Sequence, residues 1–131
     1  MLTDLDETLL HQAAATFDNT NISDHRFFDR MVVGFHKEDA ANVIMGLAKY
    51  KNMNTFEGFA CVQHGESQHN LRVARPLRPD VNDMVNGPVS VEFSEPLKSL
   101  RIKLDPGEHN TSFDVVYTGL TPPYEEGYHI A

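Results

Sequence analysis

Residues 89–94 read V-S-V-E-F-S, and residues 99–104 read S-L-R-I-K-L. In both stretches apolar residues alternate with polar ones, which is the period of a β-strand that buries one face. Pro96 lies between the two stretches and Pro106-Gly107 follows the second, and these residues interrupt strands. The pattern therefore predicts two neighbouring antiparallel strands, each with one apolar face.

Similar strand patterns occur before and after these two stretches. Further strands are predicted over residues 26–36, 42–50, 55–63, 67–75 and 111–120. Short polar or glycine-containing turns separate the earlier strands, and residues 76–88 form the longest loop. About seven strands of even length predict an all-β fold, either an antiparallel barrel or a β-sandwich.

The domain organisation follows from the same pattern. Residues 1–23 are predicted to be an irregular or briefly helical N-terminal extension, and residues 24–131 a single β domain. Near Met31 and Val43 the strands are apolar on both faces, which predicts burial on both sides.

Composition excludes several classes of function. The chain has 131 residues, with 11 Lys and Arg against 19 Asp and Glu, and a net charge of −8. Such a charge repels nucleic acid and anionic lipid, so neither is an expected partner. A single cysteine, Cys61, fits a reducing compartment, and no apolar run is long enough for a membrane span. We therefore predict a cytoplasmic protein.

Motifs for common cofactors and metals are missing from the sequence. It contains no P-loop, dinucleotide fingerprint, nucleophile elbow or metalloprotease motif, so no cofactor is predicted. The seven histidines lack zinc-type spacing. His64 and His69 flank a predicted hairpin turn and are interpreted as solvated turn residues in preference to a metal site, so no metal is predicted.

Five strings occur in an order and spacing that resemble a known family, the hydroxyneurosporene synthase or AttH-like group of lipocalin-like proteins. The strings are residues 23–30, SDHRFFDR; 68–72, QHNLR; 87–97, from Gly-Pro to Glu-Pro-Leu; 100–106, from Leu-Arg to Leu-Asp-Pro; and 121–126, TPPYEE. The resemblance covers most of the chain from about Leu10 onward and corresponds to the N-terminal half of those proteins. It departs from them because the chain has no Trp and ends at Ala131, without their second β-half.

The resemblance implies a lipocalin-like β architecture that binds an apolar small molecule, such as a terpenoid, a carotenoid or a steroid-like compound. It also implies cofactor-independent chemistry of a lyase (hydro-lyase) or an isomerase or cyclase. Whether this chain is an enzyme is left open. Three explanations of the missing half stay open: a separate β subunit as partner, a portion cut off from this chain, or a second copy of this chain in a homo-oligomer.

Two residues are candidates for the acid that such chemistry needs. Asp29 belongs to a charged cluster beside Phe27 and Phe28, and a carboxylic acid in an apolar mouth can protonate an alkene. The alternative is an ion-pair network that fixes the first strand. His69 falls on an apolar row of its strand, where it is either a proton donor or a structural histidine.

The expected ligand-binding residues are aromatic side chains and one arginine. Aromatic faces stabilise carbocations, although aromatic residues are also ordinary members of a β core. Arg72 belongs to the main basic concentration, which suits either an anion at the cavity mouth or pairing with nearby acids. The predicted set is Phe27, Phe35, Tyr50, Phe59 and Arg72.

Two hypotheses follow from this reading. The first is one half of a cofactor-independent enzyme acting on an isoprenoid-type substrate. The second is a non-catalytic carrier or accessory subunit that completes a β structure with a partner chain.

Overall fold

The computed structural model describes residues 28–80, 82–107 and 110–122. Within these residues the chain forms eight β-strands and one 3-10 turn. They are β1 (Asp29–Lys37), β2 (Ala41–Tyr50), η1 (Lys51–Met53), β3 (Thr55–His64), β4 (Ser67–Pro76), β5 (Val85–Asn86), β6 (Val89–Glu95), β7 (Ser99–Leu104) and β8 (Phe113–Thr118).

The strands make two antiparallel sheets of four strands each, in the orders β1-β2-β3-β4 and β5-β6-β7-β8. We call them the first and the second sheet. The predicted all-β class is confirmed. Of the two architectures expected, the described residues form two separate sheets, as in a sandwich, and do not close into a barrel. The predicted extension over residues 1–23 lies outside the described residues, and the boundary of the β domain stays a prediction.

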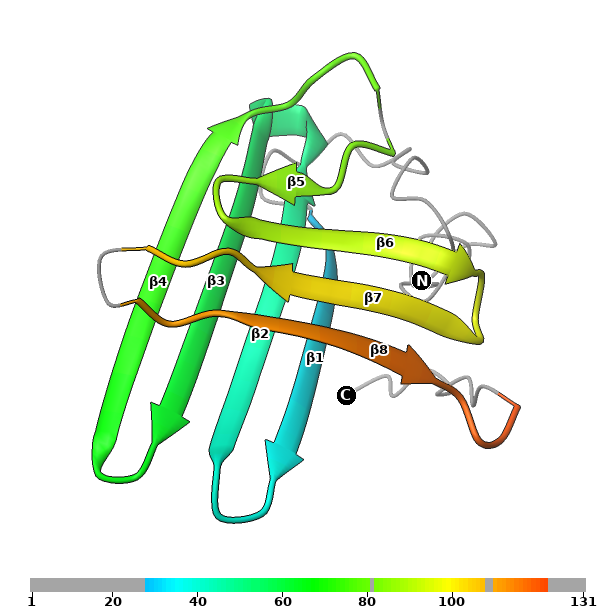
Figure 1. Cartoon of the computed structure of the whole chain (residues 1–131). Helices are drawn as coiled ribbons and strands as arrows, with labels where there is room; N and C mark the ends of the chain where they lie inside the picture. Colours follow the sequence, from blue (N-terminus) through cyan, green and yellow to red (C-terminus); the bar gives the residue numbers. More distant parts are fainter. Residues whose placement is uncertain (1–27, 81, 108–109, 123–131) are drawn as a thin grey trace, which may run out of the picture.

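The second sheet lies across the first, and its strands run at a steep angle to the long strands beneath them (Figure 1). Apolar side chains from both sheets form a single layer between them. Its fully buried members include Met45, Leu47 and Phe56 of the first sheet, and Val89 and Ile102 of the second. Burial of this shared layer is the main favourable contribution to folding.

The alternation that opened the sequence reading is confirmed in the second sheet. Val89 and Val91 of β6 and Ile102 and Leu104 of β7 are buried, while the outward-facing Glu92, Ser94 and Arg101 are exposed. Tight turns set the register of the sheet. Gly87, at φ 59°, follows β5 directly, and this positive φ suits the first position of a two-residue hairpin loop.

Two expectations about the strands were wrong. The first strand is buried on one face only, because Arg30 and Val32 point outward and are exposed, whereas in β2 the outward-facing Gly46 and Ala48 are buried as expected. The predicted long loop over residues 76–88 contains the short strand β5, since Val85 and Asn86 pair with the start of β6. Neither feature has a clear signal in the sequence: a valine on an outer face and a strand of two residues both escape period analysis.

The register places four rows of side chains across the inner face of the first sheet. From one end to the other, the rows are Asp29, Lys49, Phe56 and Arg75; Met31, Leu47, Gly58 and Val73; Val33, Met45, Ala60 and Leu71; and Phe35, Val43, Val62 and His69. In the first row, three charged side chains flank the Phe56 ring, and the other three rows are mainly apolar.

On the outer face of the first sheet, the ring of Phe59 lies over Gly46. A Cβ atom at Gly46 would be 2.5 Å from Phe59 Cε1 and 3.1 Å from the carbonyl oxygen of Met31. Glycine is therefore required here by close approach of the neighbouring atoms.

We expect Gly46→Ala to lower the free energy of unfolding by about 1–3 kcal/mol, because the added methyl overpacks the contact with Phe59. Gly34→Ala is the matched control, since it lies on the adjacent strand and its nearest neighbour would be the Val43 carbonyl oxygen at 3.5 Å. Urea unfolding of both variants measures the difference. Equal stability of the two variants would contradict the close approach.

Candidate ligand-binding site

A groove opens between the β1 edge of the first sheet and the β6–β7 end of the second. Its volume is about 320 Å³. Met31 and Val33 form one wall, and Phe93, Leu100 and Tyr117 form the other. We call it the β1 groove. Val32, Leu97, Ser99, Gly119 and the ion pair of Glu95 with Lys98 complete its border.

Tyr117 joins the two walls of the β1 groove. Its hydroxyl group donates a hydrogen bond to the backbone carbonyl oxygen of Gly34, which ties β8 to the edge of β1. Burial raises the pKa of the Tyr117 hydroxyl, so the group remains protonated and acts as a hydrogen-bond donor at neutral pH. The groove is thus apolar along its walls and has a fixed polar group at one place.

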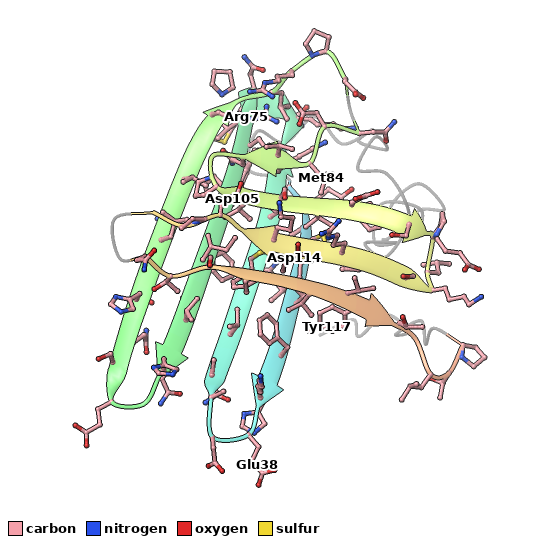
Figure 2. All side chains as sticks on the ribbon, in the orientation of Figure 1. Glu38, Arg75, Met84, Asp105, Asp114 and Tyr117 are labelled. Atoms are coloured by element: carbon pink, nitrogen blue, oxygen red, sulfur yellow. The ribbon has the colours of Figure 1, made fainter. Side chains whose placement is uncertain are left out.

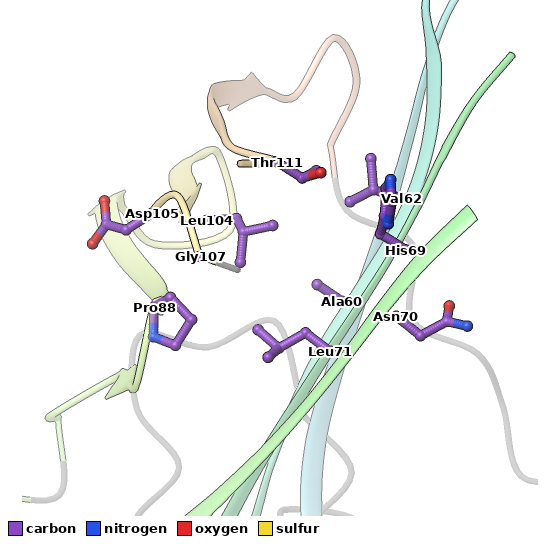
Figure 3. A pocket seen from close by; sticks show the side chains of 10 residues that line it. All are labelled: Ala60, Val62, His69, Asn70, Leu71, Pro88, Leu104, Asp105, Gly107 and Thr111. Carbon is purple, nitrogen blue, oxygen red and sulfur yellow. The ribbon is translucent and has the colours of Figure 1, made fainter. Parts of the chain in front are cut away.

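A second, smaller pocket lies on the opposite side of the sandwich, between β3–β4 on one side and the β5–β6 turn and the β7–β8 loop on the other. Its volume is about 160 Å³. We call it the His69 pocket (Figure 3). Its apolar lining is Ala60, Val62, Leu71, Pro88 and Leu104, and its other lining residues are His69, Asn70, Asp105, Gly107 and Thr111.

The charged row of the first sheet is covered by β5 and the preceding loop. Figure 2 shows Arg75 at this end of the sheet and Glu38 at the other. The Arg75 guanidinium carbon lies 4.7 Å from the centre of the Phe56 ring, and Lys49 Nζ lies 5.2 Å from the same centre. Asn86 donates a hydrogen bond of 2.8 Å to the Phe56 carbonyl oxygen. We call this group, together with Asp83, the Arg75 cluster.

Asp83 connects the loop to the cluster. One carboxylate oxygen accepts a hydrogen bond from the Val85 N–H, at 3.1 Å. The other lies 2.8 Å from Arg78 Nη1 and 3.1 Å from Arg75 Nη2. Arg75 also donates to the carbonyl oxygens of Val85 and Pro76, each at 2.9 Å. The arrangement holds residues 76–80 and 82–86 against the first sheet and gives the Arg75 guanidinium several partners.

Burial and neighbouring charges shift the pKa values in this cluster. Burial lowers the pKa of Lys49, which is only 2% exposed, and the negative charge of Asp83 partly offsets that effect. Burial alone would raise the pKa of Asp83. The Val85 N–H and the two arginines outweigh it, so that the pKa of Asp83 falls below its ordinary value.

This balance predicts how stability depends on pH. Because the pKa of Asp83 is lower in the folded state, the ionised carboxylate adds stability above its ordinary pKa of 3.8, and that stability is lost as the pH falls toward the folded value. We expect Asp83→Asn to cost about 1–3 kcal/mol at pH 7 and clearly less at pH 3. Urea unfolding at both pH values measures this.

The matched control is Glu92→Gln, which removes an exposed carboxylate from the outer face of β6. It should leave the midpoint of unfolding nearly unchanged at both pH values. A cost for Asp83→Asn that is the same at pH 7 and pH 3 would contradict the role assigned to its charge.

The two residues predicted as acids are both on the inner face, but they are far apart. Asp29 lies in the charged row and is 5% exposed, and His69 lies in the fourth row and lines the His69 pocket. Phe35, which belongs to the His69 row, lies six residue steps along β1 from Asp29, or about 20 Å at roughly 3.3 Å per step. The structure does not bring them to one site.

The predicted ligand-binding residues are divided between the two faces of the first sheet. Phe35 is on the inner face, where its ring meets Phe113 edge-on with centres 5.2 Å apart. Tyr50, Phe59 and Arg72 are on the outer face by register.

Each outer-face member has a packing or charge partner. Tyr50 stacks near Phe28, with centres 5.1 Å apart, and Phe59 covers Gly46. Arg72 forms an ion pair of 3.0 Å with Glu57. Phe27, the fifth predicted ligand-binding residue, lies outside the described residues.

The arginines and histidines of the β3–β4 hairpin are dispersed. Arg72 points outward from the first sheet and Arg75 inward. His69 pairs with Val62, whereas His64 pairs with Ser67 beside the turn. Within the described ranges, no group of three or more His, Cys, Asp or Glu side chains is arranged to hold a metal ion. No helix in the described part of the chain is long and apolar enough to cross a membrane.

Sequence reasoning missed the residues that line the β1 groove and those of the Arg75 cluster. A signal existed for Lys49, which continues the inward row of Val43, Met45 and Leu47 at a spacing of two. Tyr117 likewise continues the row of Phe113 and Val115. Alternation shows that such residues point inward. It does not show which of them border an opening.

Comparison with known proteins places the chain in a family. Residues 2–130 match a family of unknown function, DUF8625. The chain belongs to DUF8625. No curated protein and no solved structure matches it. The resemblance of this DUF8625 protein to the hydroxyneurosporene synthase group therefore stays a prediction, as do its second β-half, its oligomeric state and its location in the cell.

Proposed function

We propose that this DUF8625 protein binds an apolar small molecule of isoprenoid or steroid-like type in the β1 groove. The observation that carries the proposal is the groove itself, which has a volume of about 320 Å³ and walls of Met31, Val33, Phe93 and Leu100. Binding sites for small molecules generally begin at about 300 Å³ and are lined mainly by apolar and aromatic side chains.

The polar groups of the groove support a neutral ligand. Glu95 and Lys98 lie 3.0 Å apart at the border and neutralise each other, and both side chains are more than half exposed. The hydroxyl groups of Tyr117 and Ser99 are the other polar side-chain groups among the described lining residues, and burial raises the pKa of Tyr117 further above neutrality, so that it carries no charge. A neutral molecule with a large apolar surface therefore loses the least hydration energy on entering.

Binding is favoured over catalysis by the positions of the acids. Hydration, dehydration, isomerisation or cyclisation started by a proton needs an acid beside the bound double bond. Neither Asp29 nor His69 is among the described residues that line the groove. Among those lining residues the one carboxylate is that of Glu95, and it is paired with Lys98. The carrier or accessory role is thus the better supported of the two hypotheses.

β-Ionone, a monocyclic isoprenoid ketone, is a suitable probe for this proposal. We expect its addition to shift the NMR signals of the Met31, Val33 and Leu100 methyl groups in a saturable way. Val32→Glu places a carboxylate at the groove and should weaken binding at least tenfold, or by about 1.4 kcal/mol.

Ile44→Glu is the matched control for Val32→Glu. Both side chains are β-branched and about half exposed, at 50% and 55%, but Ile44 does not border the groove. The Ile44→Glu variant should bind β-ionone as tightly as the unsubstituted protein does. Equal weakening by the two substitutions, or no saturable shift of the groove methyl groups, would overturn the proposal.

A further inference from the structure

The His69 pocket is a second site, separate from the β1 groove and with a different character. It lies beside the β3–β4 edge of the first sheet, whereas the groove lies beside β1 at the other edge. We propose that the His69 pocket binds a small neutral molecule consisting of a single aromatic ring with a hydroxyl group.

The size of the pocket fits one six-membered ring. Its volume is about 160 Å³. In another protein, an apolar cavity of roughly 150 Å³ stays free of water and binds benzene. A carotenoid or a steroid is far larger than this, so the pocket selects a different class of ligand from the one proposed for the β1 groove.

The walls suit the faces of an aromatic ring. Five of the ten lining residues are apolar without aromatic rings of their own, namely Ala60, Val62, Leu71, Pro88 and Leu104. Four of them lie in strands and the fifth, Pro88, directly precedes β6; Ala60 and Val62 are almost completely buried. A wall built on strands keeps its shape, and a preformed apolar pocket lowers the ordering cost of binding.

Polar groups meet the pocket at one end. Figure 3 shows the His69 ring beside Val62, with the Thr111 side chain directed toward them. The Asn70 amide and the Asp105 carboxylate point away from the interior (Figure 3), and Asp105 lies 3.4 Å from Lys103 Nζ. His69 and Thr111 are therefore the groups placed to meet a polar substituent on the ligand.

The chemistry of these two groups favours a hydroxyl substituent. A neutral imidazole can accept a hydrogen bond from a phenolic O–H, and a threonine hydroxyl can both donate and accept. His69 and Thr111 each also interact with another group of the protein. An imidazole has two ring nitrogens, and a hydroxyl group has one donor and two acceptor sites, so each can bind a second partner. An anionic ligand is disfavoured by the net charge of −8 and by the nearby Asp105.

The test uses the full chain with NMR-labelled methyl groups and three probes, namely phenol, toluene and β-ionone. Phenol should shift the methyl signals of Ala60, Val62, Leu71 and Leu104 in a saturable way. Toluene has the same ring without the hydroxyl and should bind there about three- to tenfold more weakly, as expected for one lost hydrogen bond.

Substitutions then locate the hydrogen bond. His69→Ala should reduce the preference for phenol over toluene to about one, while His64→Ala, which alters an exposed histidine of the same hairpin, should leave it unchanged. Thr111→Val is the second variant. Thr111 lies outside the strands, so this substitution can still test the hydrogen bond if the His69→Ala variant does not fold. It should also reduce the preference.

The outcomes separate this inference from the proposed function. Phenol and toluene binding equally, or phenol shifting only the Met31, Val33 and Leu100 methyl groups, would overturn the His69 pocket proposal and leave the β1 groove proposal standing. If phenol shifts the methyl signals of the pocket but β-ionone shifts none in the groove, the β1 groove proposal would be overturned and the His69 pocket proposal would stand. No saturable shift with any probe would overturn both.

Discussion

The crossing of two sheets over one apolar layer is the constraint on which the rest of the structure depends. Sheets that cross at a steep angle pack closely where they overlap and diverge at their corners. In this protein the overlap is filled by fully buried side chains such as Met45, Phe56 and Ile102. The β1 groove and the His69 pocket lie toward opposite edges of the first sheet, bordered by strand ends and by the loops between strands. Both openings are therefore a consequence of sheet geometry.

The charged end of the first sheet has a different role. Asp83 and Asn86 fasten β5 and its preceding loop over Phe56, Lys49 and Arg75. A buried ionic group of this kind contributes little net stability compared with an apolar core, but breaking it is costly because a charge then remains buried without its partner. The cluster thus fixes the position of the short strand that begins the second sheet.

The direction of individual side chains could be predicted from the sequence, but their grouping into sites could not. Alternation predicted the inward rows of β6, β7 and β8, and these predictions were confirmed because a strand with one buried face must repeat every two residues. The same rule places Asp29 and His69 on the inner face and Phe59 and Arg72 on the outer one. The predicted ligand set failed to form one site because it was chosen by residue type, without regard to this period.

By itself the sequence determined the all-β class and the inward or outward direction of most side chains, since both depend on local chemistry and on a period of two. Only the tertiary structure decided which inward residues are covered and which border an opening. That outcome depends on the angle and offset between two sheets, which arise from contacts between residues far apart in the chain. Tyr117 is an example: its position in the row follows from alternation, but its hydrogen bond to Gly34 joins β8 to β1, the last and first strands along the chain.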